Sequence, residues 1–438
     1  MNVPHLDSID LDSIDTDAPL FDPAAFRLGE EEADLKALAR RLGRSRFAPR
    51  AAEYDRDARF PTENYTDLGA HGLLSICIPR EHGGMGVGYR AYCTTAAEIG
   101  RYCAATALTW NMHTCTCLWT GALADDLDMA RDEREQHRRR RALHYRRVVA
   151  EGALYAQPFS EGGVYDGTTR MTPFATVANR VPGKVPGGWR INGRKIFASL
   201  AGAADYYGIM CGDAGSDEPP SRRDAMYVAV PATAEGVDVV GDWDPLGMRG
   251  TVSRTIVFKD VFVDDDAILM PRGLYFQASM RWPHMFLSLS PTYLGIAQAS
   301  LDFTVRYLRG EIAGQNGGMS GEKRRQSASK QLAVAQMFIA LQQMKALWFQ
   351  AASEARVDPT KEQVLRALAA QYTVMEGAND LAQLALRTCG GRSLLKSLPL
   401  ERFYRDSRCG SVMIPWTAET CLERIGRESL YEAGEEDA

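Results

Sequence analysis

Two short motifs contain residue types that often do chemistry. The run Gly83-Gly84-Met85-Gly86-Val87-Gly88 is as rich in glycine as loops that hold phosphates, and Cys115-x-Cys117 offers two thiols of the kind that bind metals. The glycine run follows no expected strand and lacks the spacing of a dinucleotide-binding loop, so we predict a turn between helices. The cysteine pair has no second pair of Cys or His residues at ligand spacing, so we predict no metal site.

A basic cluster is the third candidate, and it consists of Arg138 to Arg141 with Arg146 and Arg147. Such a cluster is typical of a solvated helix face, and the alternative is a docking patch for a phosphate or a carrier protein. The net charge of the whole chain is only −5. This balance gives no reason to expect nucleic acid as a partner.

The elements that would position these residues fall into three parts. Apolar residues recur every three or four positions from Asp34 to about Val149, which predicts helices. From Gly152 to about Leu269, short alternating runs of Val, Ile, Tyr and Phe are separated by turn residues, which predicts an antiparallel β domain. Long helical periods return from Arg281 to Leu430. The order all-α, all-β, all-α makes the fold class α+β.

We predict four segments along the chain of 438 residues. The acidic, polar N-terminus favours a disordered leader over residues 1–30 and not a signal peptide. An N-terminal α-helical domain (31–150), a middle β domain (151–272) and a C-terminal four-helix-bundle domain (273–438) follow. No stretch approaches about 18 uninterrupted apolar residues, so no membrane span is expected. Nine scattered cysteines indicate free thiols in a reducing compartment, the cytoplasm.

Several segments, in order along the chain, resemble sequence signatures of the acyl-CoA dehydrogenase family. The last of them begins Cys389-Gly-Gly-Arg and continues to a Pro and the pair Arg405-Asp406. The others include Tyr54 to Pro61, Ile78 to Gly86, Ile191 to Asp205, and Pro245 to Thr251. The resemblance covers roughly residues 34 to 430. It implies an N-terminal helical domain, a middle β domain and a C-terminal helical bundle.

The resemblance also implies an activity and a cofactor. Members of this family remove the α-proton of an acyl thioester, either an acyl-CoA or an acyl-carrier-protein ester, while the β-hydrogen leaves as a hydride to N5 of bound FAD. The electrons then pass to an acceptor flavoprotein or to oxygen, and the proteins assemble as homotetramers or homodimers. We therefore expect an FAD-dependent oxidoreductase that forms a homo-oligomer.

The resemblance assigns cofactor contacts to nine positions. Phe197 would lie against the isoalloxazine ring, and the Ser199 hydroxyl would donate to its N5/O4 edge. Gly390 and Gly391 would let the backbone approach the diphosphate, with Arg387 as a nearby cation. The full set, in which Glu419 would meet a ribose hydroxyl, is Gln157, Ser160, Phe197, Ser199, Arg387, Gly390, Gly391, Thr417 and Glu419. The loop that contains Gln157 and Ser160 can be aligned with the family in two ways.

The catalytic base of the family is absent from its usual place. Many members carry a Glu in a Tyr-Glu-Gly-Thr motif, where this chain has Ile414-Pro415-Trp416-Thr417. Abstraction of an α-proton needs a base on the face of the substrate opposite the flavin. The candidate substitutes are Glu419, about one helical turn further on, His284 near the alternative base position of the family, and Glu161.

Two other functions stay open. Related reduced-flavin monooxygenases on this fold lack the Glu and use histidines near the flavin, which makes His113 a candidate. The alternative for His113 is a histidine packed within a helix. The third hypothesis is a family member that has lost catalysis and serves as a binding or assembly subunit. Bound FAD that an acyl thioester reduces would distinguish the dehydrogenase from both.

Overall fold

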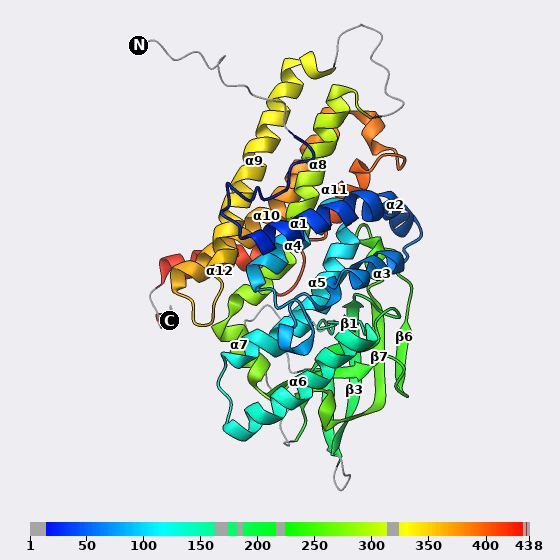
Figure 1. Cartoon of the computed structure of the whole chain (residues 1–438), viewed down its shortest axis with the longest axis vertical. Helices are drawn as coiled ribbons and strands as arrows, with labels where there is room; N and C mark the ends of the chain where they lie inside the picture. Colours follow the sequence, from blue (N-terminus) through cyan, green and yellow to red (C-terminus); the bar gives the residue numbers. More distant parts are fainter. Residues whose placement is uncertain are drawn as a thin grey trace.

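The structure of the chain is a computed structural model that describes residues 15–162, 174–181, 187–215, 224–312, 324–431 and 435. Helices from the two ends of the chain pack side by side, and a twisted sheet lies at one end of the molecule (Figure 1). The predicted order of helical, β and helical parts is confirmed. No helix within the described ranges is long and apolar enough to cross a membrane.

The N-terminal part is helical up to Glu151. Its central helices, α4 and α5, are buried along most of their length because small and apolar side chains cover nearly every face. The glycine run forms a turn before α4, as predicted, with φ of +85° at Gly83 and +67° at Gly86. The helices are α1 (Glu30–Leu42), α2 (Ala48–Arg56), α3 (Thr62–Ala70), α4 (Tyr89–Tyr102), α5 (Ala104–Leu118) and α6 (Arg131–Glu151).

The segment before α1 packs against the helices, which corrects the predicted disordered leader for residues 15–29. The first 14 residues lie outside the described part of the chain. Phe21 is fully buried, and its ring centre lies 5.6 Å from that of Trp348 on α9. The carbonyl of Ala18 accepts a hydrogen bond of 2.7 Å from the buried guanidinium of Arg101. The prediction was wrong because it rested on the acidic composition of the segment. That composition did not reveal that Phe21 packs in the core or that the Ala18 carbonyl accepts from buried Arg101.

Eight strands form one sheet within the described residues. Their order is β6-β7-β3-β2-β4-β5-β8, with β1 paired to β4. The prediction of an antiparallel sheet was wrong for β4, which pairs in parallel with β1 and β2. β3 and β7 pair along most of their length, with a register shift between Lys195 and Ala198. The strands are β1 (Tyr155–Ala156), β2 (Val177–Val181), β3 (Gly188–Ala198), β4 (Tyr206–Asp213), β5 (Ala225–Pro231), β6 (Val237–Val240), β7 (Arg254–Asp264) and β8 (Ile268–Met270).

The C-terminal part is built around three long helices, α8, α9 and α10, that pack against one another. α8 also packs against α4, so the two helical parts share one core. The short helices α11 and α12 lie against α10. The helices are α7 (Leu274–Arg281), α8 (Pro291–Arg309), α9 (Ala328–Ser353), α10 (Lys361–Cys389), α11 (Leu400–Arg408) and α12 (Ala418–Leu430).

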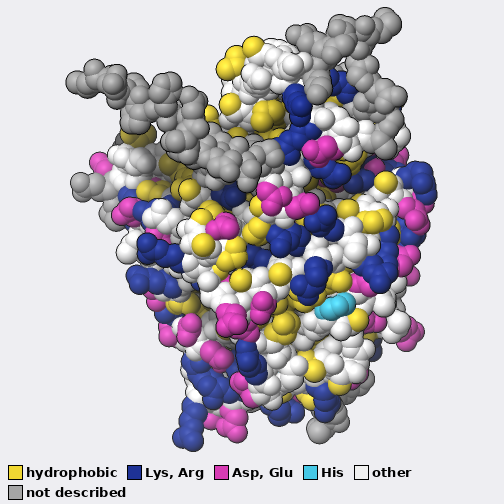
Figure 2. Space-filling view, turned by 45° about the horizontal axis from the view of Figure 1, so that its top comes forward, with side chains coloured by type: hydrophobic (Ala, Val, Ile, Leu, Met, Phe, Trp, Pro, Cys, Tyr) yellow, Lys and Arg dark blue, Asp and Glu magenta, His cyan; other side chains and the backbone are white. Residues whose placement is uncertain are grey.

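Basic and acidic side chains are interspersed over the face shown in Figure 2. The predicted arginine cluster lies on α6, and part of it forms ion pairs. Arg139 pairs with Asp266 at 2.8 Å, and Arg141 pairs with Asp125 at 2.8 Å. Arg138 is exposed. This arrangement agrees with a solvated helix face, and a docking role stays a prediction.

Candidate functional site

The end of β3 and the segment before β7 form a polar edge with a strained backbone. Phe197 and Leu200 have φ of +49° and +63°, and Met248 and Val252 have φ of +54° and +45°. Left-handed conformations are uncommon outside Gly and costly for a β-branched residue such as Val. The two segments are joined by a hydrogen bond of 3.0 Å from the Leu200 N–H to the carbonyl of Thr251. Strain of this kind concentrates at functional sites.

Three hydroxyl groups form a chain along this polar edge. The Thr251 hydroxyl donates to the carbonyl of Met248 at 2.8 Å and lies 2.7 Å from the Ser253 hydroxyl. Ser253 in turn lies 2.9 Å from the hydroxyl of Ser199. Thr251 and Ser253 are buried, whereas Ser199 is half-buried. The chain therefore begins inside the protein and ends at a residue that a ligand can reach.

Phe197 presents its ring to solvent, with 69% of its surface exposed. The ring of Trp243 lies 6.3 Å away, edge to face. An exposed aromatic residue on a strained backbone is a surface against which a flat ligand can pack. The structure thus places Phe197 and Ser199 at one edge of the sheet, and their contacts with a flavin stay predictions.

The loop after β1 is fastened to β3. The Ser160 carbonyl accepts a hydrogen bond of 2.8 Å from the Ile196 N–H, and the ring of Phe159 lies 5.6 Å from that of Tyr227. The Gln157 amide donates to the Tyr227 hydroxyl at 3.5 Å. Gln157 and Ser160 therefore lie beside the strand that carries Phe197. Their contacts with a cofactor stay predictions.

Glu161 is held in a buried ion pair. Its carboxylate lies 2.6 Å from the ammonium of Lys195, whose side chain is completely buried. The same carboxylate accepts hydrogen bonds from the N–H groups of Ala175 and Thr176 at 2.8 and 3.0 Å. Burial lowers the pKa of Lys195, and the charge of Glu161 opposes that shift. These contacts favour a structural role for Glu161, and its role as a base stays a prediction.

His284 lies in the short 3-10 segment Pro283–Leu289 and is fully buried. Neither of its ring nitrogens has a hydrogen-bond partner among the described residues. Burial lowers its pKa to about 4, and the nearby carboxylate of Glu354 opposes the shift only in part. The ring is therefore neutral at pH 7 and chemically able to accept a proton, but it is enclosed.

His113 uses both ring nitrogens within the protein. Nε2 lies 2.8 Å from the carbonyl of Leu74, and Nδ1 accepts a hydrogen bond of 3.0 Å from the Tyr155 N–H. These contacts fix a neutral ring with the hydrogen on Nε2. Burial lowers its pKa to about 4. The geometry favours the packed helix histidine over a catalytic role.

The segment that replaces the usual base connects α11 to α12. Trp416 is buried, with its ring centre 5.7 Å from that of Phe286, whereas Ile414 is exposed. Thr417 caps α12, because its hydroxyl accepts a hydrogen bond of 3.2 Å from the Thr420 N–H. Glu419 lies in the first turn of α12 with its side chain exposed. An acidic side chain in the first turn of a helix interacts favourably with the helix dipole.

A groove of about 770 Å³ lies between α8 and α9. This volume is in the range of ligand sites. Gly390 ends α10 with φ +83° and ψ −176°, a conformation open essentially only to Gly, and Gly391 follows it. The Cys389 thiol, one residue before Gly390, lies 3.8 Å from the Thr304 hydroxyl on α8. The groove combines apolar and cationic side chains, which include Val305, Leu308, Val334, Phe338, Arg309, Arg325 and Lys330.

Arg387, Gly390 and Gly391 thus lie at the end of α10 that approaches the groove. Arg387 is exposed, and open space surrounds the α-carbons of both glycines. Such a place suits a diphosphate, which needs a close approach to the backbone together with cations. The nine predicted cofactor contacts therefore fall into three groups, at or beside the polar edge, at the end of α10, and at the start of α12.

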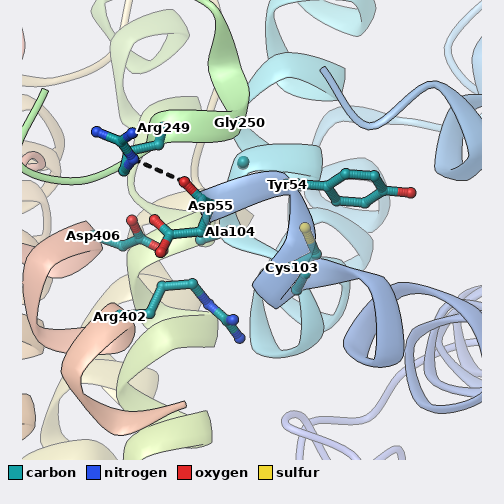
Figure 3. A pocket seen from close by; sticks show the side chains of 10 residues that line it. Tyr54, Asp55, Cys103, Ala104, Arg249, Gly250, Arg402 and Asp406 are labelled. Atoms are coloured by element: carbon teal, nitrogen blue, oxygen red, sulfur yellow. Dashed lines mark hydrogen bonds between the residues drawn. The ribbon is translucent and has the colours of Figure 1, made fainter. Parts of the chain in front are cut away.

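The polar edge is fixed by contacts at the junction of the three parts of the chain, around a small cavity (Figure 3). The Asp406 carboxylate on α11 accepts a hydrogen bond of 2.6 Å from the Met248 N–H. Arg405 forms a bidentate ion pair with Asp55 on α2, at 2.6 and 2.9 Å. Arg249 donates to the carbonyl of Asp55 at 2.8 Å. The Arg-Asp pair of the sequence signature thus fixes the strained segment between the two helical parts.

Sequence analysis missed Thr251, Ser253 and Asp406 as parts of this site. Thr251 and Asp406 stand inside the quoted signatures, but nothing in their spacing relates them to Ser199. Ser253 directly precedes the alternating run Arg254 to Lys259, which predicts a strand, and no motif of the sequence includes Ser253 as a site residue. The strand pairing of β3 with β7 could have suggested it, because that pairing brings the residues flanking the two strands together.

Three models of protein families match the chain. They are the acyl-CoA dehydrogenase N-terminal domain over residues 29–124, the middle domain over 166–261 and the C-terminal domain over 287–412. The mitochondrial short-chain specific acyl-CoA dehydrogenase of Mus musculus is 25% identical over 387 residues, which span 88% of this chain and 86% of the mouse protein.

Solved structures share the fold. FMN-bound TdsC from Paenibacillus sp. A11-2 superimposes with a TM-score of 0.76 at 23% identity, over 91% of this chain and 97% of TdsC. A glutaryl-coenzyme A dehydrogenase with bound glutaryl-CoA gives 0.75 at 21% identity, over 92% of this chain and 96% of that enzyme. Both similarities extend over most of the chain. At 23% and 21% identity they show a shared fold and nothing about function.

Proposed function

Because the chain belongs to the acyl-CoA dehydrogenase family, we propose that it is an FAD-dependent dehydrogenase of an acyl thioester, either an acyl-CoA or an acyl-carrier-protein ester. The observation that carries the proposal is the groove between α8 and α9 with its cations. The glycine turn at Gly390 ends α10, which packs against both of these helices. The groove offers a nucleotide diphosphate a place of its own, apart from the polar edge that suits a flavin ring. FMN has no adenosine diphosphate half to fill such a groove.

The residues present fit FAD in their chemistry. Phe197 offers an aromatic face and Ser199 a hydroxyl for the ring. Arg309, Arg325 and Lys330 offer cations beside an apolar surface of the groove, the combination that a nucleoside diphosphate requires. When bound, a flavin supplies the acceptor for the hydride. The protein itself must position the ring, exclude water and remove the α-proton.

We assign the removal of the α-proton to Glu419. Its carboxylate is exposed and has no ion pair among the described residues. Glu161 is instead bound to buried Lys195, and His284 is enclosed. A carboxylate in this exposed position can take up the α-proton.

Anaerobic bleaching of the flavin absorbance tests the proposal. Purified protein is mixed with a panel of acyl-CoA and acyl-carrier-protein thioesters, and at least one is expected to bleach the flavin. Glu419→Gln should slow that bleaching by about a hundredfold or more, the usual contribution of a general base. Glu423→Gln is the matched control, because Glu423 is also exposed and lies one turn further along α12.

Two results would contradict these assignments. A bound flavin that stays oxidised with every thioester would reject the dehydrogenase. Bleaching at the wild-type rate in Glu419→Gln would reject Glu419 as the base, and the same measurement on His284→Gln and Glu161→Gln would then test the other two candidates.

A reduced-flavin monooxygenase is the second candidate, and one observation favours it. The segment Ile414 to Trp416 holds no group that can take a proton, where many relatives have their base. This function predicts oxygen consumption and product formation when a separate reductase supplies reduced flavin. A protein that neither bleaches with thioesters nor consumes oxygen with a reductase would instead have a binding or assembly role.

We further propose that the enzyme acts in the cytoplasm as a homotetramer or homodimer and passes its electrons to an acceptor flavoprotein or to oxygen. The exposed apolar side chains of Phe338 and Ile339 beside the groove support an association between copies. Light scattering should give a multiple of the 48.3 kDa of one chain. A mass of one chain would contradict the assembly.

A further inference from the structure

We propose that Thr251 and Ser253 fix the direction of the Ser199 hydroxyl, so that the polar edge of β3 and β7 binds reduced flavin more tightly than oxidised flavin. This inference rests on the proposed function in one respect, namely that a flavin ring occupies this edge. It does not depend on the identity of the base or of the thioester.

The direction of the hydroxyl chain follows from its inner end. A carbonyl oxygen can only accept, so the contact of 2.8 Å to Met248 uses the one hydroxyl hydrogen of Thr251. Thr251 can then join its 2.7 Å contact with Ser253 only as the acceptor. By the same reasoning Ser253 accepts from Ser199 at 2.9 Å. The hydrogen of Ser199 is thereby directed inward, and its oxygen is left as an acceptor for a ligand.

The two redox states of a flavin differ at the atom that meets such a hydroxyl. N5 of an oxidised flavin accepts a hydrogen bond, whereas N5 that has taken up a hydride carries a hydrogen and donates. An accepting Ser199 oxygen therefore matches the reduced state. For Ser199 to donate to oxidised flavin, its hydrogen must turn away from Ser253, and the hydrogen bond between these two hydroxyls is lost. If all three hydroxyls reverse instead, the hydrogen bond from Thr251 to Met248 is lost, so the cost is one hydrogen bond in either case. One net hydrogen bond corresponds to about tenfold in affinity.

The surrounding backbone keeps the inner acceptor in place. The Met248 N–H is held by the buried carboxylate of Asp406 at 2.6 Å, and the Met248 carbonyl also accepts from the Thr251 N–H at 3.0 Å. The Thr251 carbonyl in turn accepts from Leu200. Because these contacts fix the segment on both sides, the chain has a built-in preference for one direction. Thr251 and Ser253 act through Ser199 and are positioning residues.

The midpoint potential of the bound flavin tests the inference. It is measured by spectroscopic redox titration against a reference dye, at equal flavin occupancy, in the wild type, Ser253→Ala and Thr251→Val. Either substitution frees the Ser199 hydrogen to turn outward. The ratio of affinities for reduced and oxidised flavin should then fall about tenfold, which lowers the potential by about 30 mV for a two-electron couple. Thr251→Val keeps the test open if Ser253→Ala fails to fold.

Two comparisons separate a directional effect from a general disturbance of the site. Ser253→Thr and Thr251→Ser keep a hydroxyl and should retain the wild-type potential. In a Ser199→Ala background, Ser253→Ala should no longer change the potential. An unchanged potential in both Ser253→Ala and Thr251→Val, or the same change with and without Ser199, would overturn the inference and leave the dehydrogenase proposal intact. Wild-type protein that binds neither FAD nor FMN would contradict both.

Discussion

Glu161 and Glu419 are both candidate bases, yet the regions that carry them are built differently. The carboxylate of Glu161 faces the completely buried ammonium of Lys195 at 2.6 Å and also accepts from two backbone N–H groups. The carboxylate of Glu419 is exposed in the first turn of α12 and has no ion pair in the described part of the chain. The same residue type is part of the structure in one region and available for chemistry in the other.

The two carboxylates differ in the free-energy cost of taking up a proton, and a general base must keep this cost low. A general base takes up a proton and loses its charge in each turnover. Neutralising Glu161 would leave Lys195 as a buried cation without a counterion, which is expensive in free energy. Neutralising Glu419 would forfeit only its interaction with the helix dipole, about 0.3–1 kcal/mol. Glu419 can therefore change charge in every cycle while the fold stays intact.

The largest expected change in the free energy of unfolding is that of a substitution at Glu161. Glu161→Gln keeps the size of the side chain but removes the countercharge of buried Lys195. The free energy of unfolding should fall by about 3–5 kcal/mol, as it does when one partner of a buried pair is lost. Urea denaturation followed by circular dichroism measures this change. A variant with wild-type stability that nevertheless fails to be reduced by thioesters would make Glu161 a base.

The double variant Glu161→Gln with Lys195→Met is the control. The Lys195→Met change removes the unpaired charge while filling much of the volume, so stability should recover by about 2 kcal/mol relative to Glu161→Gln alone. The N–H groups of Ala175 and Thr176 bond to different oxygens of the Glu161 carboxylate, and the amide of Glu161→Gln has only one oxygen to accept from them. That loss is the same in both variants, so it cancels in their comparison. No recovery in the double variant would show that the charge of Lys195 is not the cause.

The layout of the fold could be predicted from the sequence, and the contacts that decide the site could not. Helical and strand periods are local signals, and the motif around Ser199 placed it at the end of a strand. The pairing of Lys195 with Glu161, in contrast, spans 34 positions and depends on a loop closing over β3. The contact of Ser199 with Ser253 spans 54 positions and depends on the register of β3 with β7. Such contacts follow from tertiary packing, which local patterns do not encode.

The missing base illustrates the same limit. The sequence showed that Ile414-Pro415-Trp416 cannot take up a proton, and that absence suggested three substitutes of equal chemical merit. Only burial and pairing distinguish them, because an enclosed imidazole, a paired carboxylate and an exposed carboxylate look alike in a sequence. The packed leader segment before α1 was missed for a related reason, since Phe21 finds its partner Trp348 more than 300 positions away.

Asp406 is a third kind of carboxylate, because it is buried but forms no ion pair within 4.0 Å among the described residues. Its contribution to the free energy of unfolding is expected to depend on pH. Burial, together with repulsion from Asp55, raises its pKa to about 6. The folded state therefore binds more protons than the unfolded state between about pH 4 and 6, and this contribution to stability is lost as the pH rises through that window. Asp406→Asn keeps an acceptor for the Met248 N–H but does not titrate.

The free energy of unfolding of the wild type should thus decline between pH 4 and 6 by about 1–3 kcal/mol relative to Asp406→Asn. Urea denaturation of both proteins across this range measures the difference, and groups that titrate alike in the two proteins cancel. A wild type that instead gains stability over the variant as the pH rises would mean that Asp406 is held in its charged form by Arg402 and Arg405. The junction would then resemble the region of Glu161.

The smallest expected change in the free energy of unfolding is that of Glu419→Gln. A small change is what distinguishes a carboxylate available for chemistry from one that stabilises the fold. Glu419→Gln removes one favourable interaction with the N-terminus of α12, so the free energy of unfolding should fall by no more than about 0.3–1 kcal/mol. Glu423→Gln, one turn further from the helix end, should change it less. A stability that is nearly unchanged, measured beside a large loss of flavin reduction, would assign that loss to chemistry. A loss of stability as large as that of Glu161→Gln would place Glu419 among the structural carboxylates, and the two regions would no longer differ.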